Sequence, residues 1–128
     1  MSYKYVVDSY AWIEYFRGSK AGEKAKVIIE GGEAATATIT IAELKEKYAR
    51  EGWSYFDDDL LFITSSTLLV NLTKDIAVKT GEINVAMKAK VKGWGTADSI
   101  ILATAQTASA KVLTGDKHFK GKQTNHSN

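Results

Sequence analysis

Four acidic residues stand at points where a predicted strand has ended or a predicted helix is beginning. Asp8 ends the first apolar β-prone run, and Asp116 follows the last one. Glu43 and Asp98 each lie in the first turn of a predicted helix. Functional sites of open parallel sheets gather beyond the carboxyl ends of the strands. We therefore expect these four carboxylates to meet at one rim of the molecule.

Carboxylates that converge repel one another, because like charges a few ångströms apart resist joint ionisation. A hard divalent cation relieves this repulsion, and carboxylate oxygens together with water suit Mg²⁺ or Mn²⁺. Such an ion lowers the pKa of a bound water and neutralises charge on a phosphate under attack. The predicted chemistry is therefore metal-assisted hydrolysis of a phosphate ester.

Each acid also has a purely structural explanation. Thr40 and Glu43 have the spacing of a capping box, in which side chains and backbone N–H groups bond reciprocally. Asp98 in a first helical turn is favoured by the helix dipole. Asp116 could form a turn after a glycine, and Asp8 could cap a helix. The catalytic interpretation depends on all four acids sharing one rim.

The composition excludes or disfavours several other kinds of catalytic and metal site. The chain has 128 residues, no cysteine and two histidines, His118 and His126, both near the C-terminus. Thiolate catalysis and cysteine zinc sites are excluded, and a Ser–His–Asp triad is hard to build. The net charge of +2 neither requires nor excludes an anionic partner. No segment has the length of a membrane span and no secretory signal is evident, so we expect a cytoplasmic protein without a membrane partner.

The elements that must position the acids alternate between strands and helices. Strands are expected at residues 3–7, 34–39, 67–70 and 111–114. Helices are expected at residues 9–17, 21–30, 40–50, 55–63, 72–91 and 96–108, with Asn71 as the cap of the fifth helix. This alternation predicts an α/β fold with a parallel sheet covered by helices on both faces. We expect one domain over residues 1–120, followed by a polar, flexible tail over residues 121–128.

Four stretches of this sequence resemble the PIN-domain ribonucleases, especially the VapC-type toxins of toxin–antitoxin pairs. The first is Val6-Val7-Asp8-Ser9 with Trp12-Ile13, and the second runs from Thr38 to Leu44. The third runs from Thr96 to Ala105, and the fourth from Val112 to Phe119. They follow the family's order and span most of the chain.

The resemblance implies a three-layer α/β/α sandwich, with a parallel sheet of four or five strands. It also implies an endoribonuclease that depends on Mg²⁺ or Mn²⁺ and hydrolyses RNA, with a homodimeric assembly and an antitoxin protein as partner. Asp8, Glu43, Asp98 and Asp116 match the family's catalytic, metal-binding quartet. Thr114 and Ser9 match supporting hydroxyl positions.

The C-terminus departs from the family's pattern. Family members usually continue past the last aspartate into a further apolar strand. Here the polar run from Gly121 to Asn128 follows instead, and it shows no apolar pattern of a strand. The last strand that the resemblance implies is therefore either missing or altered in this chain.

An acidic centre would need basic or aromatic groups around it to hold RNA. Arg17, Lys92 and Lys117 lie near the predicted rim and could attract phosphates. An exposed Trp94 could stack on an unpaired base. The competing interpretation is a solvated surface for the basic residues and packing against neighbours for Trp94.

Two other functions remain open from the sequence. One is a module of the same fold that binds RNA or a protein without turnover. The other is an Mg²⁺-binding receiver domain of phospho-signalling. A receiver domain would call for adjacent acids after the first strand and an aspartate after the third, whereas Asp8-Ser9 and Val70-Asn71 occupy those places.

Overall fold

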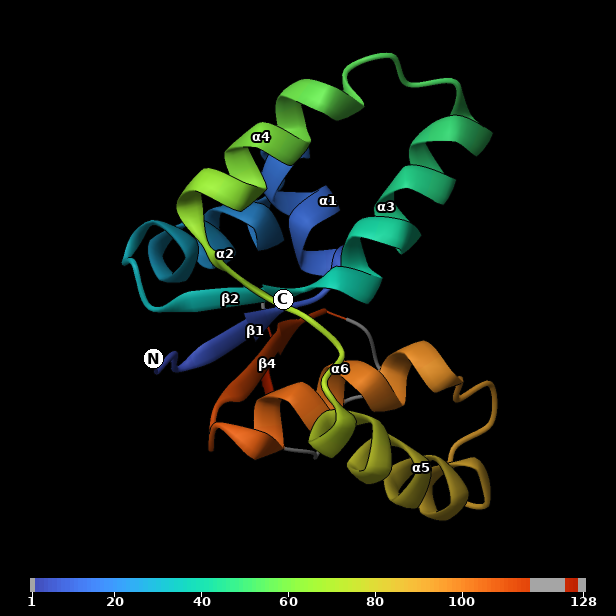
Figure 1. Cartoon of the computed structure of the whole chain (residues 1–128). Helices are drawn as coiled ribbons and strands as arrows, with labels where there is room; N and C mark the ends of the chain where they lie inside the picture. The colour runs from blue at the N-terminus through green and yellow to red at the C-terminus, as the bar shows by residue number, and fades with distance from the viewer. Residues whose placement is uncertain (1, 116–123, 127–128) are drawn as a thin grey trace.

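Five parallel strands form one sheet at the centre of the molecule (Figure 1). The computed structural model describes residues 2–115 and, as backbone, residues 124–126. The strands are β1 (Tyr5–Val7), β2 (Ala34–Ala37), β3 (Leu68–Val70), β4 (Lys111–Thr114) and β5 (Thr124–His126). Their order across the sheet is β3-β2-β1-β4-β5, and each neighbouring pair is parallel. This confirms the predicted α/β class.

Helices cover both faces of the sheet and make three layers. One face packs against α1 (Ser9–Arg17), α2 (Lys20–Glu30), α3 (Thr38–Glu51) and α4 (Phe56–Ser66). The other face packs against α5 (Lys74–Lys88) and α6 (Thr96–Thr107). Figure 1 shows the first group above the sheet and the second below it.

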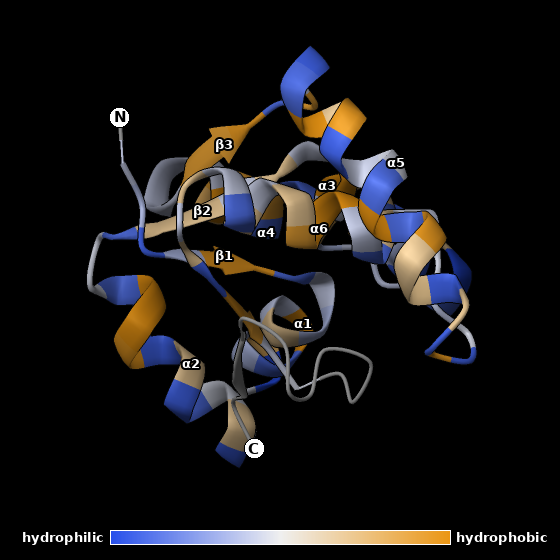
Figure 2. Cartoon of the chain, turned by 90° about the horizontal axis from the view of Figure 1, so that it is seen from below, coloured by the Kyte–Doolittle hydropathy of each residue, from blue (hydrophilic) through white to orange (hydrophobic). Residues whose placement is uncertain are grey.

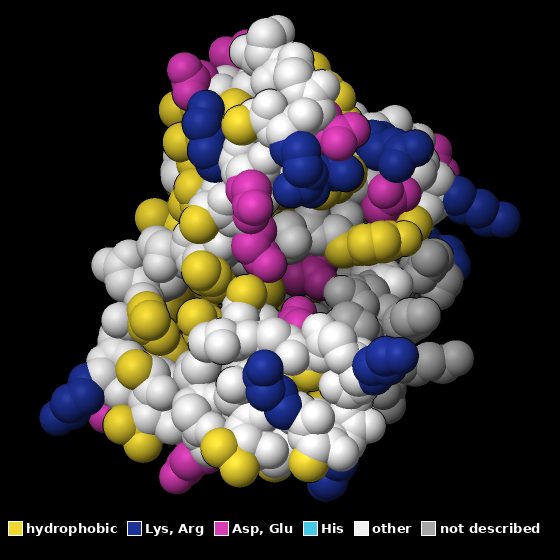
Figure 3. All heavy atoms as spheres, turned by 90° about the vertical axis from the view of Figure 1, so that its right-hand side faces the viewer, with side chains coloured by type: hydrophobic (Ala, Val, Ile, Leu, Met, Phe, Trp, Pro, Cys, Tyr) yellow, Lys and Arg dark blue, Asp and Glu magenta, His cyan; other side chains and the backbone are white. Residues whose placement is uncertain are grey.

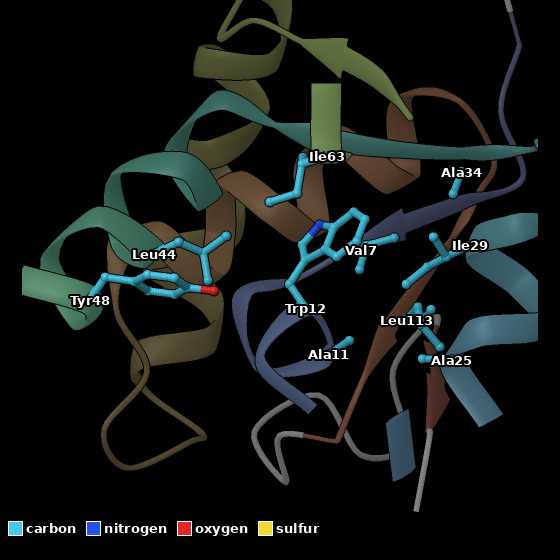
Figure 4. Close-up of a cluster of buried hydrophobic side chains, with 10 residues drawn as sticks. All are labelled: Val7, Ala11, Trp12, Ala25, Ile29, Ala34, Leu44, Tyr48, Ile63 and Leu113. Carbon is cyan, nitrogen blue, oxygen red and sulfur yellow. The ribbon is translucent and has the colours of Figure 1, made fainter. Parts of the chain in front are cut away.

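The sheet is buried on both sides because neighbouring side chains of a strand point to opposite faces. Val7 packs with the α1–α4 layer, whereas Val6 packs with the α5–α6 layer. Figure 2 accordingly shows apolar strands between helices that carry both polar and apolar residues. Figure 4 shows Trp12 of α1 in the middle of the first cluster, with Val7 beside it and Ile63 above it.

Two predicted helix starts are wrong by two residues or more, and two others differ by one residue. α3 begins at Thr38, two residues before the predicted start, because β2 ends at Ala37 and the chain turns directly into the helix. α5 begins at Lys74 and is capped by Thr73, whose Oγ1 accepts the N–H of Ile76 at 3.2 Å. The expected cap, Asn71, therefore lies outside the helix.

The polar C-terminal segment contributes a strand that the sequence did not indicate. Backbone of Thr124–His126 pairs with β4, with Thr114 level with His126. Strand pairing is made by backbone N–H and C=O groups, so a polar edge strand leaves no apolar signature. The sequence left open whether this strand was missing or altered, and the structure shows a short polar strand at these three residues.

Within residues 2–115 and 124–126, no helix has the length and apolar character needed to span a membrane.

Candidate functional site

Asp8 lies at the carboxyl edge of the sheet, between two neighbouring strands. Val6 is paired with Ala35 of β2, and Val7 with Leu113 of β4. When the same pairing is extended along the strands to Asp8, this residue lies level with Ala37 on one side and with Thr114 on the other. The Asp8 side chain is only 3% exposed. A carboxylate therefore stands buried at the middle of the rim, as the sequence predicted.

The Asp8 carboxylate also holds the start of α1. Its Oδ1 accepts the backbone N–H of Ala11 at 2.8 Å, which makes Asp8 the N-cap of the helix. Its backbone N–H donates to the carbonyl oxygen of Leu113 at 3.2 Å. The capping role and the predicted catalytic role thus fall on the same side chain, which has a fixed orientation.

Asp98 lies in the first turn of α6 and binds the backbone immediately before that helix. Its Oδ2 accepts the N–H of Gly95 at 2.9 Å. Gly95 is the N-cap residue and has extended backbone. Since glycine has no side chain to cap the helix, Asp98 supplies the bond that fixes how the chain enters α6.

A buried chain of hydrogen bonds supports this helix start from behind. Trp94 donates from Nε1 to Ser99 Oγ at 2.7 Å, and the Ser99 hydroxyl donates to Asn84 Oδ1 at 2.9 Å. Ser99 is fully buried and Trp94 is 3% exposed. These bonds join α5 to the loop and first turn of α6, so they position the segment that carries Asp98.

Glu43 lies on α3, the helix that follows β2 at the rim. Because α3 starts at Thr38, Glu43 lies in its second turn rather than its first. The N-cap is Ala37 and makes no side-chain capping bond, so the predicted capping box of Thr40 and Glu43 is wrong. One oxygen of the Glu43 carboxylate, Oε1, is buried, and so is the hydroxyl of Thr40 one turn earlier.

The two predicted hydroxyls fall on either side of Asp8. Thr114 is fully buried at the end of β4, and Ser9 is the half-buried first residue of α1. Asp116 and Lys117 lie outside the described residues. The structure therefore brings Asp8 and Thr114 to one rim, with Glu43 and Asp98 near the starts of the two helices that lead away from it.

Hard oxygen donors at this rim have the right chemistry for Mg²⁺ or Mn²⁺. Within residues 2–115 and 124–126, however, no three His, Asp or Glu side chains lie close enough together to hold a metal ion. Three of the four predicted ligands belong to those residues. The donor types thus fit a divalent cation, and the metal centre itself stays a prediction.

The structure corrects one of the predicted RNA contacts. Trp94 packs within the α5–α6 cluster and is 3% exposed, so its ring is not available to stack on a base. Arg17 and Lys92 are exposed, as a role in attracting phosphates would require. Arg17 also forms an ion pair with Glu14, at 3.4 Å between Nη1 and Oε2.

A groove of about 900 Å³ opens beside the rim, between α1, α3 and the segment that leads into α4. Its lining includes Ser9, next to Asp8, together with apolar, aromatic, basic and acidic side chains, among them Phe16, Trp53, Tyr55, Arg17, Lys47 and Glu14. Figure 3 looks onto the carboxyl edge of the sheet and shows acidic side chains inside a hollow, with lysine or arginine side chains on both sides of it.

One wall of the groove is fixed by a short hydrogen bond. Tyr48 Oη donates to Asp59 Oδ2 at 2.6 Å and so ties α3 to α4. Burial raises the pKa of the Tyr48 phenol above its ordinary value of 10, and the bond to Asp59 raises it further. Tyr48 therefore stays protonated and keeps donating well into the alkaline range.

Sequence reasoning missed Thr40, Asn84 and Ser99 as parts of this region. Asn84 and Ser99 are 15 residues apart, so no local spacing reveals their bond. Ile41, Leu44 and Tyr48 have the spacing of one apolar helix face, but the buried residues of α3 are Thr40, Leu44 and Tyr48. The apolar spacing does not show that a hydroxyl lies on the buried face.

Comparison with known proteins identifies the family of this chain. The model of the PIN domain matches residues 5–123. No curated protein matches the chain by sequence.

Solved structures share the fold. A toxin–antitoxin complex from Klebsiella pneumoniae has a chain with TM-score 0.77 and 22% identity, and the match covers 98% of both chains. VapBC2 from Rickettsia felis, bound to promoter DNA, has TM-score 0.73 at 16% identity, with 91% of this chain and 90% of that chain covered. VapC20 of Mycobacterium tuberculosis, a toxin that cleaves the sarcin–ricin loop, has TM-score 0.70 at 14% identity, covering 94% and 92%. With the family match over most of its length, the chain belongs to the PIN-domain family.

Proposed function

We propose that this protein is a divalent-metal-dependent endoribonuclease and the toxin of a VapBC-type toxin–antitoxin pair. The observation that carries the proposal is the buried Asp8 carboxylate at the carboxyl edge of the sheet. The helices that bear Glu43 and Asp98 start at this same edge, in a chain of the PIN-domain family. No cysteine is present, and both histidines lie near the C-terminus, so carboxylates are the available catalytic groups.

Asp8, Glu43, Asp98 and Asp116 would hold Mg²⁺ or Mn²⁺. The ion would supply a water of lowered pKa and neutralise charge on the phosphate. Asp8 and Asp98 are already oriented by backbone N–H groups. Pre-orientation of this kind favours catalysis because little reorganisation is needed when the substrate binds. Arg17 and Lys92 would draw the RNA backbone toward the negatively charged rim.

The groove supports the proposed antitoxin partner. Ser9 is part of its lining and is next to Asp8 in the chain, so a protein segment bound in the groove could cover the site. Its aromatic residues, Phe16, Trp53 and Tyr55, are of the kind that anchors protein interfaces. The Klebsiella pneumoniae and Rickettsia felis structures are themselves toxin–antitoxin complexes.

We further propose a homodimer in the cytoplasm. Val78 and Val85 are 62% and 78% exposed and lie seven residues apart on α5, hence on one face of that helix. Exposed aliphatic residues on one helix face suit a contact with a second copy. Sedimentation of the wild type and of Val78→Lys would test the dimer, and an unchanged sedimentation coefficient would contradict this interface.

The nuclease proposal is tested by cleavage of single-stranded RNA in the presence of Mg²⁺ or Mn²⁺, with EDTA as the negative condition. Asp8→Asn and Asp98→Asn preserve shape and should lower the rate by about 10²- to 10⁴-fold, the range expected for a lost catalytic group. Asp58→Asn, an exposed position at the start of α4, is the matched control and should retain the wild-type rate. Full activity of either rim variant would refute the assignment.

A non-catalytic module that binds RNA or a protein is the second candidate. It predicts RNA binding that persists when the rim acids become alanine, without cleavage at any metal concentration. The receiver-domain alternative is excluded, because the chain belongs to the PIN-domain family. Its strand order also differs from the 2-1-3-4-5 order of that fold type.

A further inference from the structure

The hydroxyl of Thr40 is buried without a hydrogen-bond partner among the described residues. Thr40 is 0% exposed, and its Oγ1 makes no hydrogen bond with residues 2–115 or 124–126. Other buried threonines in helices behave differently. Thr80 donates to the carbonyl of Ile76 at 2.7 Å, and Thr104 donates to that of Ile100 at 2.7 Å. Thr40 is therefore a local exception that calls for a physical cause.

The cause lies in its position near the start of α3. A helical threonine commonly satisfies its hydroxyl through the carbonyl three or four residues earlier. For Thr40 these residues are Ala37 and Thr36, which belong to β2 rather than to the helix. No helical carbonyl is in place there to accept the bond. An unsatisfied buried hydroxyl costs free energy, because it has lost its bonds to water.

The position of Thr40 places its hydroxyl beside the acidic rim. It lies three residues beyond Ala37, which is level with Asp8 by the register of the sheet. Thr40 and Glu43 are three residues apart in α3, so their side chains are neighbours on the helix surface. The Oε1 atom of Glu43 is buried as well. The hydroxyl thus stands at the rim end of the buried stripe formed by Thr40, Leu44 and Tyr48.

We propose that the Thr40 hydroxyl belongs to the functional site and bonds an oxygen that enters with the ligand, namely a water in the shell of a divalent cation. This inference rests on the proposed metal-dependent function. Mg²⁺ keeps several of its waters when it binds to proteins, and those waters need acceptors and donors from the chain. Thr40 would be a positioning residue for such a water beside Glu43.

The first test measures thermal stability in EDTA, without ligand. Thr40→Val keeps the shape and removes the unsatisfied hydroxyl, so we expect the Tm to stay unchanged or to rise by about 2–4 °C. Thr104→Val is the matched control, since its hydroxyl is bonded within α6. The control should give a lower Tm than Thr40→Val. A marked fall in the Tm of Thr40→Val, equal to that of the control, would overturn the inference.

The second test measures Mn²⁺ binding by titration calorimetry with no RNA present. Thr40→Val should weaken binding by about 10-fold or more, the lower end of the range for residues that support metal ligands. Thr40→Ser retains the hydroxyl and should restore wild-type affinity. Equal Mn²⁺ affinity in wild type and Thr40→Val overturns the inference. An effect seen only with a non-hydrolysable dinucleotide in Ca²⁺ also overturns it, by assigning the bonded oxygen to a phosphate.

These measurements separate the inference from the proposed nuclease function. Cleavage by the wild type tests the nuclease, whereas the difference between Thr40→Val and Thr40→Ser tests Thr40. If the wild type binds Mn²⁺ but cleaves no RNA, a weaker affinity of Thr40→Val still supports the inference. If the wild type binds no Mn²⁺, both the metal site and the role of Thr40 are overturned.

Discussion

The helices α3 and α6 both bring an acid to the rim, but their first turns are built differently. At α6, Asp98 bonds the Gly95 N–H, and the Trp94–Ser99–Asn84 bonds fix the turn from behind. At α3, the cap residue is Ala37, no side chain caps the helix, and Thr40 holds an unsatisfied hydroxyl. The sequence offered a capping box of Thr40 and Glu43 as the structural alternative to a catalytic role, and α3 does not have that capping box.

The difference shows where each helix is anchored. α6 is fixed at the end that carries its acid. The polar anchor of α3 lies two turns beyond Thr40, where Tyr48 bonds Asp59 of α4. A helix start held by hydrogen bonds is set before a ligand binds, whereas a buried unsatisfied hydroxyl can still gain a bond from a ligand. We therefore expect the Asp98 side of the proposed site to be preformed and the Thr40 side to respond to the ligand.

Trp94→Ala is expected to have the largest effect on stability, because it removes a buried ring and the bond to Ser99. We expect a loss of about 3–5 kcal/mol in the free energy of unfolding, measured by urea denaturation. Trp53→Ala, at a half-exposed ring beside α3, is the comparison and should cost less. A larger loss at Trp53 would mean that the α3 side is the better packed of the two.

Asn84→Ala should have an intermediate effect. It leaves the buried Ser99 hydroxyl without its acceptor, which costs about 1–3 kcal/mol. We also expect faster hydrogen exchange at the Gly95 amide, because the first turn of α6 loses its support. Asn71→Ala, at an exposed asparagine, should leave both quantities unchanged. Unchanged exchange in Asn84→Ala would show that the Asp98 bond alone fixes this helix start.

Tyr48→Phe should have the smallest effect at neutral pH, a loss of about 1 kcal/mol from the bond to Asp59. The effect of this substitution on stability should depend on pH. Because the folded pKa of Tyr48 is raised above 10, its contribution is complete below pH 10 and is lost as pH rises toward the folded value. The stability difference between wild type and Tyr48→Phe should therefore shrink above pH 10.

Urea denaturation of both proteins between pH 8 and about 11 measures this difference. Tyr10→Phe, at an exposed tyrosine, serves as the control. The contribution of Tyr15 to stability should also be lost at high pH, because burial and its hydrogen bond to Glu30 raise its pKa to about 12. A difference that stays constant with pH would contradict the Tyr48 anchor.

Much of the fold could be predicted because each element carries its own local pattern. The strand of residues 111–114 was predicted with the observed bounds, and the helix starting at Thr96 with the observed start. Gly18 and Gly52 end α1 and α3 in the left-handed conformation that glycine adopts readily. The strand of residues 124–126 was missed, since its pairing is a property of backbone groups alone.

The sequence by itself determined that carboxylates follow the strands and that strands alternate with helices, because spacing along the chain encodes both. Only the tertiary structure decided that Trp94 is buried, that Ser99 bonds Asn84, and that the Thr40 hydroxyl has no partner in the part of the chain that is described. Those properties depend on which distant segments pack against each residue. Local pattern thus places a side chain on an element, whereas packing between elements decides whether its polar atoms are satisfied.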